Sequence, residues 1–102
     1  MHHFFPRALL KKHKVKASDI DTFANYVVIR QDTNLRAGAD EPASYIEVAL
    51  AAAGKDSRKV RAAIRRQGVP DGPELWRVAN YAGFLAERRK LLAAAANRFL
   101  GL

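Results

Sequence analysis

The sequence has no cysteine among its 102 residues, which excludes disulfide bonds and thiolate metal sites and fits a reducing cytoplasm. Long apolar runs are missing as well, because the longest stretches fall well short of the roughly 18 residues that a membrane-spanning helix needs. Met1 is followed at once by histidines, so we expect no secretory signal. Together these absences predict a cytoplasmic protein without a membrane partner.

Acidic residues are few: 10 Asp and Glu stand against 18 Lys and Arg, which gives a net charge of +8. The surplus gathers in residues 1–18, which contain no acid, and in residues 55–66, where Asp56 is the one acid. Clustered basic charge is typical of proteins that bind nucleic-acid phosphates. The predicted DNA-binding residues are Arg7, Lys11, Lys12, Lys14, Lys16, Lys55, Arg58, Lys59, Arg61, Arg65 and Arg66. The alternatives are a solvated basic surface and adhesion to anionic lipid.

The chain is long enough for one domain with one core, and its abundant alanine favours helix. The β-branched cluster at residues 26–29 predicts a strand. Residues 1–5 are expected to end a second strand that Pro6 terminates. Between the strands we expect a short basic helix or loop from Arg7 to Lys14 and a helical turn capped by an acid or serine of residues 18–21. Residues 31–36 are expected to form a short helix that carries Asn34.

Three helices are expected in the second half of the chain, because apolar residues recur there at helical spacing. Their expected ranges are residues 42–54, 57–68 and 74–100. Their expected buried faces are Tyr45, Val48, Ala49 and Ala52; Val60, Ala63 and Ile64; and Leu75, Val78, Ala82, Leu85, Leu92 and Phe99. The aromatic residues expected in the core are Trp76, Tyr81, Phe84 and Phe99. The run Arg88-Arg89-Lys90 is expected to form a solvated helix face, with phosphate contact as the alternative.

The first third of the chain contains residue types suited to phosphodiester hydrolysis. That reaction needs a base for the attacking water and a cation for the charge that develops on phosphoryl oxygens. A neutral imidazole is a good base near neutral pH. Adjacent residues at a strand end point to opposite sides, so His2 and His3 are expected to have different roles. Asn34 can complete a metal site, and Asn25 can fix the orientation of the base.

These residues form a pattern that resembles the HNH (His-Me finger, ββα-metal) endonucleases. The pattern consists of His2-His3-Phe4-Phe5-Pro6, then Asn25 leading an apolar strand, then Asn34 and Pro42-Ala43-Ser44-Tyr45-Ile46. It looks most like the version at the carboxyl end of GmrSD-like modification-dependent restriction proteins. Gly68-Val69-Pro70 and Phe84-Leu85-x-x-Arg88-Arg89-x-Leu91-Leu92 are similar too, so the resemblance spans most of the chain.

The resemblance implies a metal-dependent DNA endonuclease domain, α+β and mostly α, in a restriction or phage-defence context. Residues 1–46 would form a small ββα-metal-like finger with a shortened first strand, and residues 47–102 a helical scaffold. His3 would be the general base, Asn25 its orienting residue, and His2 and Asn34 the metal ligands. The implied ion is Mg²⁺ or Mn²⁺, with Zn²⁺ as an alternative. The chain would be the carboxyl-terminal piece of a longer protein with an amino-terminal nucleotide-dependent domain.

Three other interpretations stay open on the sequence. The first is that Met1-His2-His3 is the remnant of an affinity tag. The second is a non-catalytic basic helical module that binds nucleic acid. The third is a helical interaction domain whose positive charge serves only solubility. Asn25 and Asn34 would then be an ordinary strand-entry residue and a helix cap, and His13 is expected to be a surface residue in every case.

Overall fold

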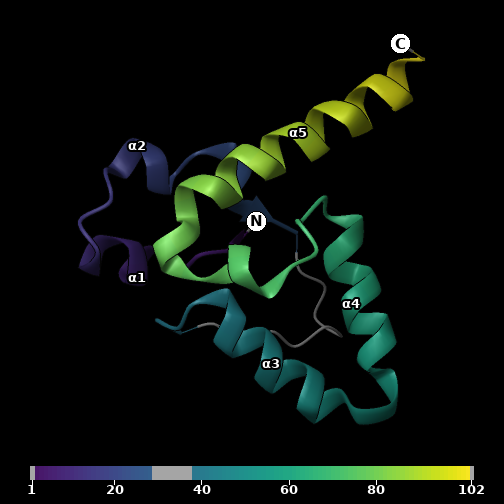
Figure 1. Ribbon diagram of the computed structural model, residues 1–102, viewed down its shortest axis with the longest axis horizontal. Coiled ribbons are helices and arrows are strands. Elements are labelled where there is room, and N and C mark those ends of the chain that lie inside the picture. Colours follow the sequence, from purple (N-terminus) through teal and green to yellow (C-terminus); the bar gives the residue numbers. More distant parts are fainter. Residues whose placement is uncertain (1, 29–37, 102) are drawn as a thin grey trace.

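The computed structural model describes residues 2–28 and 38–101, and Figure 1 shows its helices and its small sheet. The elements are, in order, β1 (His2–His3), α1 (Arg7–Lys12), α2 (Ala17–Ile20), η1 (Phe23–Asn25), β2 (Tyr26–Val27), α3 (Pro42–Ala53), η3 (Gly54–Asp56), α4 (Ser57–Arg66), η4 (Pro73–Trp76), η5 (Val78–Asn80) and α5 (Tyr81–Leu100), where η marks a short 3-10 turn. The protein is α+β and mostly helical, which confirms the predicted fold class.

The two strands form an antiparallel pair in which His2 lies opposite Val27 and His3 lies opposite Tyr26. One further backbone bond, 2.7 Å from the Phe4 amide to the Asn25 carbonyl, continues the pairing beyond the strands. The predicted strands are therefore present, each with two residues. The predicted helix at residues 31–36, which would complete a ββα finger, lies outside the described residues, as does Asn34.

The core is built on the two phenylalanines that follow the histidines. Phe4 and Phe5 are completely buried, and both contact Phe84 of α5. The Phe4 and Phe84 rings are stacked with centroids 5.1 Å apart, whereas Phe5 meets Phe84 edge to face at 4.9 Å. The Tyr45 hydroxyl, from α3, donates to the Phe4 carbonyl. Since aromatic pairs add to the free energy of burial, this cluster anchors the histidine strand to the helices.

Helices α3 and α4 begin as predicted, at Pro42 and Ser57. Gly68 follows α4 with a φ of 72°, a conformation that glycine adopts without strain. The predicted face of α4 is confirmed by the burial of Val60 and Ile64. The predicted face of α3 is partly wrong, because Ile46 is buried beside Tyr45 whereas Val48 and Ala52 are exposed.

The predicted helix over residues 74–100 is wrong in its first two turns, because α5 begins only at Tyr81. Residues 73–80 form two 3-10 turns separated by Arg77 in an extended conformation. Hydrogen bonds to other segments hold this shape. The Trp76 indole donates to the Pro70 carbonyl at 2.9 Å, and the Val78 amide donates to the Glu41 carboxylate at 2.8 Å. The bond from the Val78 amide to Glu41 replaces the bond that this amide would make in a continuous helix, and the Trp76 bond holds the preceding turn in place.

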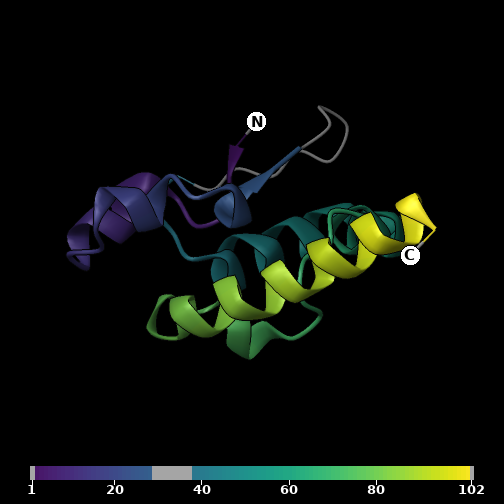
Figure 2. The ribbon, with the colours of Figure 1, turned by 90° about the horizontal axis from the view of Figure 1, so that it is seen from above.

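The far end of α5 extends away from the other elements (Figure 1). Phe99, predicted to be in the core, is 90% exposed there, and Ala82 is exposed at the other end of the same helix. Figure 2 shows the strands and α1–α2 on one side of α5 and the turns at residues 73–80 on the other. None of the helices in residues 2–28 and 38–101 has both the length and the apolar character needed to cross a membrane.

Candidate active site

His3 makes the clearest polar contact of the finger, with Asp21 in the turn that follows α2. His3 Nε2 lies 2.9 Å from Asp21 Oδ1, and the His3 side chain is 22% exposed. The imidazole also packs on Tyr26, its partner across the sheet, with ring centroids 4.5 Å apart. An ionised carboxylate can only accept hydrogen bonds, so Nε2 carries the proton and a neutral ring keeps its lone pair on Nδ1.

The Asp21 carboxylate is stabilised in its charged form. The hydrogen bond from His3 is the largest effect that lowers the pKa of Asp21, and the charge of Arg7 acts in the same direction against a partial loss of hydration. A lowered pKa in the folded state means that the stabilising contact is complete above the ordinary aspartate pKa of about 3.9 and is lost as the pH falls through the lowered value. The pair therefore persists throughout the neutral range.

Asn25 joins the two sides of the finger from a fully buried position. Its Oδ1 accepts the Phe5 amide at 2.8 Å, and its Nδ2 donates to the carbonyls of Phe5 and Ile20, each at 3.1 Å. Both ends of the amide are thus used, which only asparagine or glutamine can do. The hydrogen bonds of the Asn25 side chain go to Phe5 and Ile20 and not to the His3 ring, so Asn25 fixes the backbone two residues beyond His3.

Arg88 supports the same segment from α5, and its burial overturns the prediction that residues 88–90 form a solvated face. Only 3% of Arg88 is exposed, whereas Arg89 and Lys90 are exposed as predicted. The Arg88 guanidinium donates to the carbonyls of Ala24 (2.9 Å), Tyr26 and Gln67 (2.8 Å). Burial lowers the pKa of this guanidinium, and its Nε has no hydrogen-bond partner among the described residues.

Gln67 completes this support from the turn after α4. Its side-chain oxygen accepts the Val28 amide at 2.9 Å, while its backbone carbonyl accepts the Arg88 bond. The end of strand β2 is therefore connected to α4 and α5 by polar groups as well as by the aromatic core. Spacing could have revealed Arg88, because it lies four residues after the buried Phe84 and so shares its helix face.

Of the two metal ligands predicted by resemblance, His2 and Asn34, the structure describes only His2. His2 is exposed, and the second expected ligand, Asn34, lies outside the described residues. Within residues 2–28 and 38–101 no three His, Cys, Asp or Glu side chains gather to hold an ion. The divalent ion therefore stays a prediction.

The predicted DNA-binding residues are all exposed and lie in two places (Figure 1). One group is on and after α1, and the other is on η3 and α4, with the strand pair between them in Figures 1 and 2. In the group on η3 and α4, Lys59 is paired with Asp56 at 3.6 Å and Arg65 with Asp71 at 3.5 Å. Both pairs are exposed, and exposed ion pairs contribute little stability. The charge on both surfaces is thus available to a partner.

Asp21 is the site residue that the sequence did not identify, since its expected role was only to cap a turn. It lies four residues before Asn25, in the turn after α2, and neither spacing nor periodicity indicates that its side chain contacts His3. His13 is exposed, as predicted. Comparisons with protein-family models, with curated proteins and with solved structures find no match to the chain.

Proposed function

We propose that the protein is an HNH-type DNA endonuclease domain that hydrolyses phosphodiester bonds with His3 as the general base. The observation that carries the proposal is the contact between His3 Nε2 and Asp21 Oδ1, at 2.9 Å, on a partly exposed imidazole. A histidine held by a carboxylate is a recurrent arrangement for proton abstraction. The proposal also includes a restriction or phage-defence context, which rests on the resemblance. It includes a cytoplasmic location, which rests on the lack of cysteine.

Each described site residue has a role in this proposal. Nδ1 of His3 takes the proton of the attacking water, because Nε2 is already engaged with Asp21. The Asp21 carboxylate stabilises the positive charge that the ring then gains. Asn25 positions the strand through the Phe5 backbone, so it acts on the base indirectly. The implied Mg²⁺ or Mn²⁺, or alternatively Zn²⁺, would supply positive charge for the phosphoryl oxygens, with His2 and Asn34 as its expected ligands.

The two basic surfaces lie on either side of the strand pair. Since the strand pair, which contains His3, lies between α1 and α4 in Figures 1 and 2, a duplex in contact with both helices would pass the strand pair. Most of the contacts would be to phosphates, so we expect affinity to fall steeply with salt.

Plasmid nicking tests this proposal. The purified chain is incubated with supercoiled DNA and Mg²⁺, Mn²⁺ or EDTA, beside His3→Ala and the matched control His13→Ala, which removes an exposed histidine from the end of α1. We expect metal-dependent nicking that drops by at least about 100-fold in His3→Ala, the contribution of a general base, and is unchanged in His13→Ala. Equal nicking by wild type and His3→Ala would refute the assignment of the base.

The exposed basic side chains of α4 favour a second candidate function, a non-catalytic module that binds nucleic acid. This helix buries Val60 and Ile64 and turns five exposed basic side chains outward, namely Arg58, Lys59, Arg61, Arg65 and Arg66. Such a surface needs no catalytic group to bind phosphates. The two candidates separate in the same assay, because the module binds the plasmid without nicking it and without responding to the metal.

A further inference from the structure

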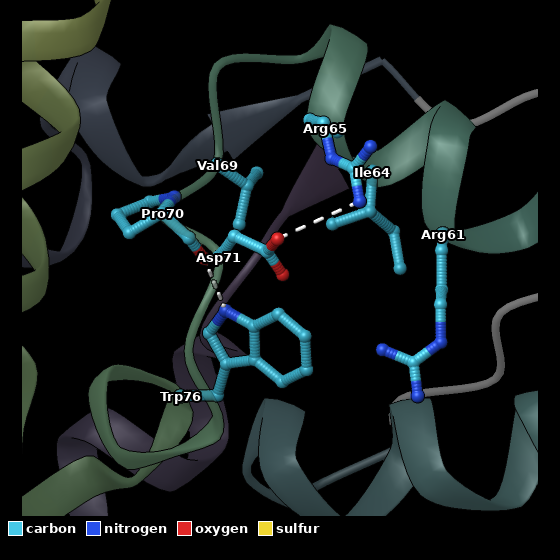
Figure 3. A pocket seen from close by; sticks show the side chains of 7 residues that line it. All are labelled: Arg61, Ile64, Arg65, Val69, Pro70, Asp71 and Trp76. Carbon is cyan, nitrogen blue, oxygen red and sulfur yellow. Dashed lines mark hydrogen bonds and ion pairs between the residues drawn. The ribbon is translucent and has the colours of Figure 1, made fainter.

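A hollow lies between α4 and the segment that leads into η4 (Figure 3). It is open to solvent and is lined by Arg61, Ile64, Arg65, Val69, Pro70, Asp71 and Trp76. Val69, Ile64 and Trp76 are buried and form an apolar wall, whereas the two arginines of α4 are exposed. Two guanidinium groups on one apolar hollow are suited to an anion, because guanidinium groups bind oxyanions in a fixed, bidentate geometry.

An anionic side chain already stands at this position. The Asp71 carboxylate lies 3.5 Å from Arg65 Nη2, and both side chains are about two thirds exposed, at 65% and 64%. The contact is longer than the roughly 2.7–2.9 Å of a charge-assisted hydrogen bond, and exposed pairs of this kind contribute little stability. Arg61, within the described part of the chain, has no carboxylate at ion-pair distance. A phosphate group can therefore replace Asp71 on Arg65 at small cost, and Arg61 lines the same hollow from one turn earlier on α4.

We propose that this hollow is a binding site, called here the seat, for one phosphodiester group of the bound nucleic acid. Arg61 and Arg65 would bind the phosphate, and in the free protein Asp71 occupies its place on Arg65. The proposal rests on the proposed function in that DNA is taken as the polymer. Of the basic positions on α4, these two arginines differ from Arg58, Lys59 and Arg66 because an apolar wall lies behind them. A wall of low polarity strengthens the attraction between a guanidinium group and a phosphate.

Trp76 makes the seat directly observable. It is the single tryptophan of the chain, it is held by the hydrogen bond to the Pro70 carbonyl, and its six-membered ring faces the side of the hollow bordered by Arg61 and Ile64 (Figure 3). A phosphodiester that displaces Asp71 replaces one anionic group with another beside this indole and moves the carboxylate away. The emission of Trp76 is therefore expected to change when DNA binds.

The test combines DNA affinity, measured by anisotropy of a labelled duplex with metal omitted, with Trp76 emission on the same samples. We expect Arg61→Gln and Arg65→Gln each to weaken binding by about tenfold, the loss of one charged hydrogen bond, and to suppress the emission change. Arg98→Gln is the matched control, since it removes one exposed charge from the far end of α5. Its effect should be much smaller, because distant charges are screened.

Asp71→Asn gives a second readout with the opposite sign. Freeing Arg65 should tighten binding by about threefold, the equivalent of one exposed ion pair. The matched control is Glu87→Gln, which adds the same charge and breaks an exposed pair with Lys90 at 3.3 Å on α5. Similar tightening by both variants would show a general effect of net charge and overturn the seat.

The remaining outcomes separate this proposal from the proposed function. If Arg65→Gln binds like Arg98→Gln while His3→Ala still abolishes nicking, the seat is wrong and the nuclease stands. If His3→Ala nicks normally while the arginine and aspartate effects appear, the seat stands and the nuclease is wrong. Inorganic phosphate that changes Trp76 emission as effectively as duplex, at equal phosphate concentration, would identify a site for free phosphate and contradict the polymer seat, as would a duplex that does not bind.

Discussion

Two polar side chains, Asp21 and Asn25, fix the segment that carries His3. Asn25 binds the backbone beyond the strand, and Asp21 binds the imidazole itself. The sequence indicated Asn25 because an asparagine before an apolar strand is part of a recognisable pattern. Asp21 was missed because a bond between residues 18 positions apart depends on how α1 and α2 fold back, which no local pattern encodes.

The first prediction concerns the tautomer of His3. Since the charged Asp21 only accepts, neutral His3 is expected to carry its proton on Nε2, whereas the amide in Asp21→Asn can donate and so permits the Nδ1–H form. Nitrogen NMR of the imidazole, at a pH where the ring is neutral, measures this directly. We expect a single Nε2–H form in the wild type, a mixture in Asp21→Asn and no change at His13. A His3 tautomer that does not respond to Asp21→Asn would contradict the pairing.

Plasmid nicking by Asp21→Asn should fall as well, by less than in His3→Ala, because the base is still present but holds its proton on the wrong nitrogen in part of the molecules. A decrease equal to that of His3→Ala, together with an unchanged unfolding midpoint, would instead assign Asp21 a direct part in the reaction. His13→Ala again serves as the unaffected control.

At the scale of helices and strands, the structure shows which sequence patterns were sufficient to predict where a helix begins and ends. The bounds of α3 could be predicted from proline at its start and glycine at its end, and α4 from its apolar spacing and the glycine that follows it. The start of α5 could not, because the bonds of Trp76 and Val78 reach segments elsewhere in the chain. Phe99 follows the helical spacing perfectly and is still exposed, since α5 is longer than the body it packs against. Periodicity gives the face of a helix but not where its neighbours end.

Arg88 shows a further limit, because an arginine is normally assigned to the surface. It lies on the face of α5 that contains Tyr81, Phe84 and Leu85, and it serves carbonyls from η1, β2 and the end of α4. The resemblance had included Arg88 in its pattern without indicating a role, and the structure supplies one.

We therefore expect Arg88→Met to reduce the free energy of unfolding by about 3 kcal/mol, because buried carbonyls lose their donors. Arg89→Met removes the same charge from an exposed position on the same helix and should change stability by no more than about 0.5 kcal/mol. Urea unfolding followed by circular dichroism measures both. Equal stability of the two variants would show that the Arg88 bonds contribute nothing net to the fold.

At the scale of the whole molecule, charge and fold are separate sources of information. The net charge of +8 predicted a polyanionic partner, and its two clusters predicted which residues would contact that partner but not how the clusters are arranged in space. The fold places the two basic surfaces on either side of the strand pair, and the aromatic core fixes that pair to α5. The position of His3 between two basic surfaces is thus a property of the packing, and the spacing of residues in the sequence does not indicate it.

The most direct test of His3 as the base is chemical rescue of His3→Gly by imidazole in the nicking assay. Removing the side chain leaves the strand pair in place, because its bonds are made by the backbone and by Asn25. Free imidazole can then act as a diffusible base. We predict that imidazole restores metal-dependent nicking to His3→Gly in proportion to its concentration and leaves His13→Gly unchanged. Nicking by His3→Gly at the wild-type rate without imidazole would contradict the account.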